Sequence, residues 1–175
     1  MSPFEVGVGG GVRRGLWSRR LAALCLALAS CAAPTAKVDR DSSLHSLEGW
    51  IHAAVNAHRV SSGLVPLGYD PSVADIARGH SRSMAAHRTG VGHKDFAARA
   101  KAISGILNSS GFAENVSRHH RSDRRDAEIA EAAMALWLPS QVHRKNLEGR
   151  YDVTGVGVVR SADGTLYVTQ IFVRQ

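Results

Sequence analysis

The spacing of apolar residues predicts helices in the first two thirds of the chain. Apolar side chains recur every three or four residues from Leu44, which predicts a helix to about Arg59. Asp70-Pro71 begins a second helix, because aspartate caps a helix N-terminus and proline is tolerated at its first position. A short helix is predicted over residues 97–106, and a longer one ends at Pro139. The apolar stripe of that last helix is predicted to be Ile129, Ala132, Ala133, Leu136 and Trp137.

The C-terminal pattern changes to that of strands. Residues 153–159 and 165–173 are rich in β-branched side chains, and the turn between them contains Gly164. Apolar residues occupy both faces of the last segment, so we expect both faces to be covered. Helices followed by strands predict an α+β fold, a three-layer α-β-α sandwich with a mainly antiparallel sheet.

The N-terminus has the pattern of an export signal. Basic residues between Arg13 and Arg20 precede the apolar run Leu21–Ala29, which is too short to span a bilayer. We therefore expect residues 1–30 to be a signal peptide. Leu28-Ala29-Ser30-Cys31 resembles the lipobox of bacterial lipoproteins, in which the cysteine is acylated and becomes the new N-terminus; the alternative is an ordinary secretory signal that contains a cysteine.

The lipobox sets the expected location and organisation of the protein. Two or three acyl chains on Cys31 suffice for stable membrane anchoring. The small, polar residues 31–43 are then a tether, and residues 44–175 form one domain. We expect a protein of the cell envelope, lipid-anchored outside the cytoplasm or secreted.

Charge argues against a nucleic-acid partner. The chain carries a formal net charge of +7, but the signal holds four of its 22 basic residues and one of its 15 acidic ones. The remaining 145 residues therefore carry only +4, and no nucleic acid is expected as a partner.

Three titratable residues are candidates for a functional site. His93 follows glycines in a loop, and loops often carry function. Glu114 lies in the short buried segment "GFAENV", and His143 follows Pro139 and Ser140 at the end of a helix. His80, in contrast, lies on an apolar stripe and is expected to be a buried histidine with a hydrogen-bond partner. Ser140 is expected to cap the turn that contains His143.

Several stretches, in this order, resemble the bacterial branch of the CAP superfamily, which includes cysteine-rich secretory proteins, antigen 5 and pathogenesis-related proteins. They cover roughly residues 47–173: "VNAHRVSSGLVPLGYDPSVADIARGHSRSMAAH", "GHKDF", "GFAENV", "WLPSQVHRKNL", "TGVGVV" and "YVTQIF". The resemblance implies an α-β-α sandwich, with two histidines and two acids around a central cleft that can hold a divalent metal.

The resemblance places specific residues in that cleft. His93 matches the first histidine, Glu114 the first acid and His143 the second histidine. Ser140 stands where the second acid usually falls, which lowers the formal charge of the cleft. His93 and His143 would then bind zinc or another divalent metal, weakly and with reduced discrimination.

Two functions remain open. The first is a non-catalytic envelope module whose cleft binds a small ligand, a lipid or a metal, with protein partners also possible. The second is a hydrolase, either metal-assisted through His93, His143 and Glu114 or serine-based through Ser140, His143 and Glu114. No G-x-S-x-G sequence frames the serine, and the metal version lacks a third strong ligand. Binding is therefore favoured over catalysis.

Overall fold

The computed structural model describes the backbone of residues 35–120 and 125–175, and the side chains from residue 44 onward within those ranges. The predicted signal peptide and its acceptor Cys31 lie outside the described residues. Among the described residues, no helix has both the length and the apolar character needed to cross a membrane.

Five helices and four strands form in the described part of the chain. The helices are α1 (Thr35–Ser61), α2 (Pro71–Ala85), α3 (Phe96–Ser104), α4 (Asp126–Trp137) and α5 (Gln141–Leu147). The strands are β1 (Gly68–Tyr69), β2 (Gly111–His119), β3 (Val153–Arg160) and β4 (Leu166–Arg174), in the sheet order β1-β3-β4-β2.

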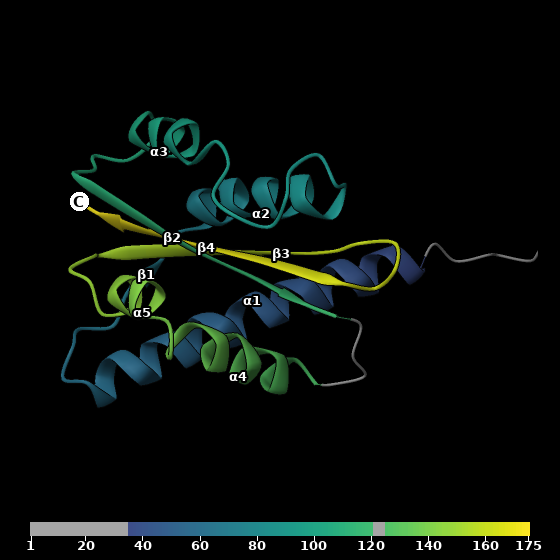
Figure 1. Cartoon of the computed structure of the whole chain (residues 1–175), viewed down its shortest axis with the longest axis horizontal. Helices are drawn as coiled ribbons and strands as arrows, with labels where there is room; N and C mark the ends of the chain where they lie inside the picture. The colour runs from purple at the N-terminus through teal and green to yellow at the C-terminus, as the bar shows by residue number, and fades with distance from the viewer. Residues whose placement is uncertain (1–34, 121–124) are drawn as a thin grey trace, which may run out of the picture. The chain divides into compact units, whose positions relative to one another are not determined.

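The elements form the three layers that the sequence predicted. Helices α2 and α3 lie on one side of the sheet, and α1, α4 and α5 lie on the other (Figure 1). Strand β4 pairs antiparallel with both β2 and β3, while the two-residue strand β1 pairs parallel with β3. The sheet is therefore mixed but mainly antiparallel, and the predicted fold class is confirmed.

Strand β4 is the centre of the core. Its residues from Leu166 to Val173 are all buried, as expected for a strand with apolar side chains on both faces. Leu166, Val168 and Phe172 join the core under α1 and α4, whereas Ile171 and Val173 join a second cluster with α2 and α3. Trp137 is fully buried in the first cluster.

Helix α2 packs unusually closely against β3. A Cβ atom added to Gly155 would lie 2.2 Å from the backbone nitrogen of Ala74, and one added to Gly157 would lie 2.1 Å from that of Arg78. Only glycine permits this approach of helix to strand. The helix begins as predicted, because the Asp70 side chain accepts hydrogen bonds from the next two free backbone N–H groups.

Three local predictions were wrong. Helix α1 begins at Thr35, where no helix was predicted, because the sequence of residues 35–43 has no apolar period. The apolar spacing predicts that the second helix continues to His87, but α2 ends at Ala85 and His87 lies beyond it with a positive φ of 54°. Leu136 is 53% exposed, and Met134 is buried instead. The sequence of α4 is apolar nearly all round, so its spacing did not distinguish between two neighbouring faces.

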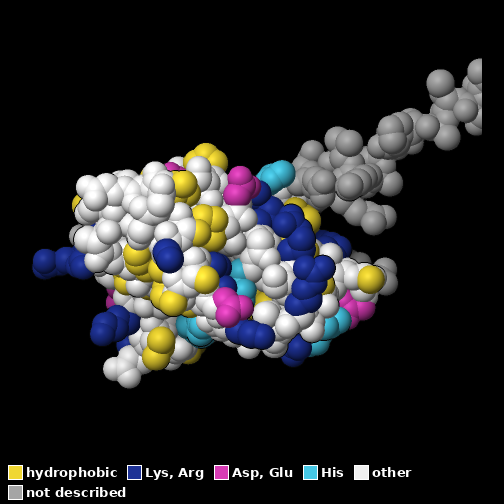
Figure 2. All heavy atoms as spheres, turned by 90° about the horizontal axis from the view of Figure 1, so that it is seen from above, with side chains coloured by type: hydrophobic (Ala, Val, Ile, Leu, Met, Phe, Trp, Pro, Cys, Tyr) yellow, Lys and Arg dark blue, Asp and Glu magenta, His cyan; other side chains and the backbone are white. Residues whose placement is uncertain are grey.

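The surface over α2 and α3 is basic in part. Figure 2 views the molecule from the side of these helices and shows a band of Lys and Arg side chains across one half of that face. Histidine side chains lie in the middle of the same face, beside basic and acidic ones.

Candidate functional site

A buried ion pair lies at the centre of the candidate site. Glu114 is on β2, an edge strand of the sheet, and its side chain is only 1% exposed. Arg99 on α3 donates from Nε to Glu114 Oε2 at 2.8 Å and from Nη2 to Glu114 Oε1 at 2.7 Å. Both carboxylate oxygens are therefore held by one guanidinium in a two-point contact, which is strong and directional.

Arg99 also connects this pair to His80. The Nη1 atom of Arg99 donates to the Lys94 carbonyl at 2.7 Å and lies 3.1 Å from His80 Nδ1. His80 Nε2 lies 2.7 Å from the Gly92 carbonyl, which can only accept, so Nε2 carries the proton and Nδ1 accepts from Arg99. Burial lowers the pKa of His80 and favours this neutral form. The predicted buried histidine with a partner is confirmed.

His93 contacts the Glu114 carboxylate of this ion pair, and its side chain is half exposed. It comes from the loop between α2 and α3, and its Nδ1 donates to Glu114 Oε1 at 2.9 Å. A carboxylate that accepts from Nδ1 fixes the tautomer of a neutral imidazole and leaves Nε2 as an acceptor. The His93 side chain is 50% exposed, so this nitrogen is available to a ligand.

His143 reaches the site from the opposite layer of the sandwich. Two asparagines connect α5 to the edge strand β2. Asn115 Nδ2 on β2 donates to the His143 carbonyl at 3.1 Å. Asn146 Nδ2 on α5 donates to Asn115 Oδ1 at 2.9 Å and to the Glu114 carbonyl at 3.2 Å. These hydrogen bonds fix α5, which carries His143, against β2.

The His143 ring lies close to His93 and is partly buried. Burial lowers the pKa of His143, and the charge of the nearby His93 lowers it further. His143 Nδ1 is buried without a hydrogen-bond partner among the described residues. An unpaired buried polar atom is uncommon and costly, so it marks a position for a ligand atom or an ordered water. The structure thus brings His93, Glu114 and His143 together at the β2 edge.

Ser140 has a structural role at this site. It is the N-cap of α5, and its hydroxyl accepts from the His143 backbone N–H at 3.5 Å. The predicted cap is confirmed. Within the described part of the chain, the Ser140 hydroxyl shows no hydrogen bond to a histidine or carboxylate side chain, so its position gives no support to the serine hydrolase.

The donor set does not fit a tightly bound metal. Among residues 35–120 and 125–175, no group of three or more His, Cys, Asp or Glu side chains is placed to hold an ion. His93 and His143 supply two imidazoles, but Arg99 already occupies both oxygens of Glu114. Zinc sites usually have at least three protein ligands. The same contacts make Glu114 a poor general base, since its charge is balanced by a guanidinium at hydrogen-bond distance.

Arg99 is the residue that the sequence analysis missed. Its helix was predicted, but the arginine itself was not singled out. The available signal was its spacing: Arg99 lies four residues before Ile103, the buried apolar residue of α3, and so shares its face. An arginine on a buried helix face requires an acidic partner, and Glu114 is the acid of the strand that follows.

Comparisons with known proteins agree with this fold. The family model described as the cysteine-rich secretory protein family, CAP, matches residues 52–172. An extracellular protein of Bacillus anthracis that contains an SCP domain superposes with a TM-score of 0.62 at 24% identity, over 82% of this chain and 45% of that one. An outer surface protein of Borrelia burgdorferi superposes with a TM-score of 0.60 at 16% identity, over 74% of this chain and 93% of that one.

A third solved structure, a cysteine-rich secretory protein of Staphylococcus aureus, gives a TM-score of 0.54 at 24% identity, over 77% of this chain and 39% of that one. This chain thus spans less than half the length of two of these three proteins. No curated protein sequence matches it.

Proposed function

Because the chain belongs to the cysteine-rich secretory protein (CAP) family, we propose that it is an envelope protein whose cleft, formed by His93, Glu114, Ser140 and His143, binds a small ligand without chemical turnover. The proposal rests on one observation: Arg99 donates hydrogen bonds to both carboxylate oxygens of Glu114, the residue to which His93 also donates. Glu114 is thereby used to position His93, and its two oxygens are not free to accept a proton from a substrate or water.

The location follows from the N-terminal sequence. The basic and apolar pattern of residues 13–29 and the lipobox at Cys31 support export and lipid anchoring. Likeness to an extracellular protein and to an outer surface protein is consistent with this location. The protein would then act at the outer side of a membrane that it does not span.

The chemistry of the cleft favours a ligand with a hydrogen-bond donor. His93 Nε2 is an exposed acceptor when the ring is neutral, and the buried Nδ1 of His143 has no partner among the described residues. A hydroxyl, amide or other neutral polar group of a small molecule or lipid headgroup fits two such rings. A divalent metal would find only these two nitrogens and would bind weakly.

The proposal can be tested without knowing the ligand. Protein would be purified gently from bacterial envelopes and weighed by native mass spectrometry, alongside the double variant His93→Ala, His143→Ala. A matched control is His87→Ala, His120→Ala, which removes two exposed histidines outside the site. We expect a non-covalent mass on the wild type and the control that is absent from the cleft variant.

Turnover tests the competing function. Fluorogenic peptide and ester substrates would be incubated with the wild type and with Glu114→Gln. We expect no hydrolysis by either protein. Hydrolysis by the wild type that Glu114→Gln abolishes would contradict the proposal and establish the hydrolase.

A further inference from the structure

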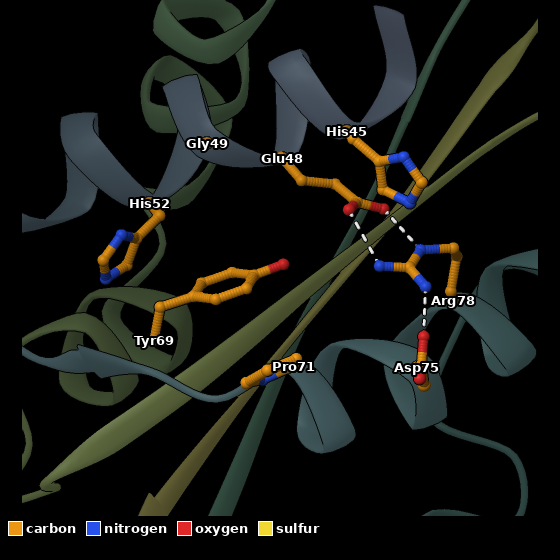
Figure 3. Close-up of a pocket in the computed structure, with 8 residues that line it drawn as sticks. All are labelled: His45, Glu48, Gly49, His52, Tyr69, Pro71, Asp75 and Arg78. Atoms are coloured by element: carbon orange, nitrogen blue, oxygen red, sulfur yellow. Dashed lines mark hydrogen bonds and ion pairs between the residues drawn. The ribbon is translucent and has the colours of Figure 1, made fainter. Parts of the chain in front are cut away.

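A second pocket lies at the other edge of the sheet, away from the β2 edge that carries Glu114. It occupies about 440 Å³ between α1, β1 and the start of α2. Figure 3 shows the Tyr69 ring between the two helices, with His52 at one end and the ion pair of Glu48 and Arg78 at the other. The volume lies within the range of small-molecule sites in proteins.

The charges in the wall of this pocket are already balanced by one another. Glu48 Oε1 accepts from Arg78 Nε at 2.8 Å and from the Val158 backbone N–H at 2.9 Å, while Oε2 accepts from Arg78 Nη2 at 3.0 Å. Asp75 also pairs with Arg78. Glu48 is only 1% exposed. A strongly charged ligand would have to compete with these internal pairs, so the wall favours a neutral one.

Beside the ion pair, the pocket is lined by a histidine, a tyrosine and an exposed carboxylate, which can hydrogen-bond to a ligand. His52 Nε2 lies 3.0 Å from the Leu67 carbonyl and 3.1 Å from Asn56 Nδ2, so the ring is held in place by two hydrogen-bonding neighbours. Burial and the charge of Glu48 raise the pKa of Tyr69, so its hydroxyl remains protonated at neutral pH. Asp75 adds exposed carboxylate oxygens as acceptors.

Tyr69 gives this pocket a flat apolar surface. Tyr69 is 40% exposed as a residue, and His52 packs against its ring edge to face with ring centroids 5.3 Å apart, which holds the ring in place. A sugar ring has an apolar face of C–H groups, which pack on an aromatic ring, and a rim of hydroxyls, which both donate and accept. In this pocket, the Tyr69 ring can pack on the apolar face of a sugar, and the polar side chains can hydrogen-bond to its hydroxyls.

We propose that this pocket is a carbohydrate-binding site, in which Tyr69 packs against the face of a neutral sugar while His52 and Asp75 form hydrogen bonds with its hydroxyls. The site is separate from the His93 cleft and does not depend on the function proposed for it. Tyr69 is the anchor, because a large aromatic side chain at the centre of a binding site usually contributes most of the affinity.

Calorimetric titration of the full chain with three neutral trisaccharides, chitotriose, maltotriose and xylotriose, tests the proposal. At least one should bind saturably, and Tyr69→Ala should weaken that binding by about tenfold or more. Tyr69→Phe keeps the ring and should weaken it less. Asp75→Ala, at an exposed position, provides a second variant that should weaken binding without disturbing the fold.

The control variant is His93→Ala, His143→Ala, which should bind the trisaccharide as the wild type does. Circular dichroism would verify that each variant is folded. Failure of all three trisaccharides to bind would overturn the proposal, and so would binding that survives both Tyr69→Ala and Asp75→Ala. Loss of sugar binding in the histidine variant would also overturn it, because the sugar would then occupy the other cleft.

Discussion

Replacing Arg99 with methionine tests whether the ion pair organises the candidate site. The change removes the guanidinium that donates to both Glu114 oxygens at 2.7 and 2.8 Å, and it leaves a carboxylate that is 1% exposed. Breaking a buried pair by removing one partner typically costs about 3–5 kcal/mol, because the other charge remains buried. We expect the lower end, about 3 kcal/mol, because His93 still donates to Glu114.

Urea unfolding at neutral pH, monitored by circular dichroism, measures this loss as a change in the free energy of unfolding. The double variant Arg99→Met, Glu114→Gln removes the stranded charge, so it should recover at least about 1.5 kcal/mol of the loss. Arg82→Met is the matched control, since Arg82 is an exposed arginine of α2, and it should stay within about 0.5 kcal/mol of the wild type. A loss below about 1 kcal/mol in Arg99→Met, or no recovery in the double variant, would refute the reasoning.

Three further predictions concern the core, the pH dependence of stability and the anchor. Trp137 is fully buried, so Trp137→Ala should lower the free energy of unfolding by about 3–5 kcal/mol; a near-neutral result in urea unfolding would contradict its place in the core. His143 has a pKa below its usual 6.5 in the folded state, so the unfolded chain takes up its proton first on acidification and stability falls as pH drops through that value. His143→Gln should therefore reduce the fall in the urea midpoint between about pH 7.5 and pH 5.5, and an unchanged fall would exclude His143 as a contributor. Cys31→Ser should move the protein from the membrane to the soluble fraction in centrifugation and immunoblotting, and unchanged fractionation would contradict lipid anchoring.

The sequence predicted the layers because burial leaves a periodic signal. Strand β4 is apolar on both faces, and the structure covers both faces with helices. The start of α2 could also be predicted, because Asp70 and Pro71 determine it through contacts within the first turn of the helix. Strand β1 was missed and fell in a predicted loop, because two residues are too few to show a pattern.

The site was harder to predict because its contacts join distant parts of the chain. His93, Glu114 and His143 were predicted from their positions in the family motifs. The structure places them together, and their role in binding stays a proposal. The Arg99 contact with Glu114 spans 15 residues and depends on how α3 packs beside β2. Glu48 was missed for a similar reason: it borders the apolar stripe of α1, but its partner Arg78 is 30 residues away on α2.

The most direct test of the central claim is calorimetric titration of the protein with zinc, beside the variant His93→Ala, His143→Ala. Arg99 is the cation of this cleft, and two imidazoles alone remain for a metal. We therefore expect no saturable heat at micromolar zinc for either protein. One-to-one binding by the wild type in that range, abolished in the variant, would contradict this expectation and make the cleft a metal site.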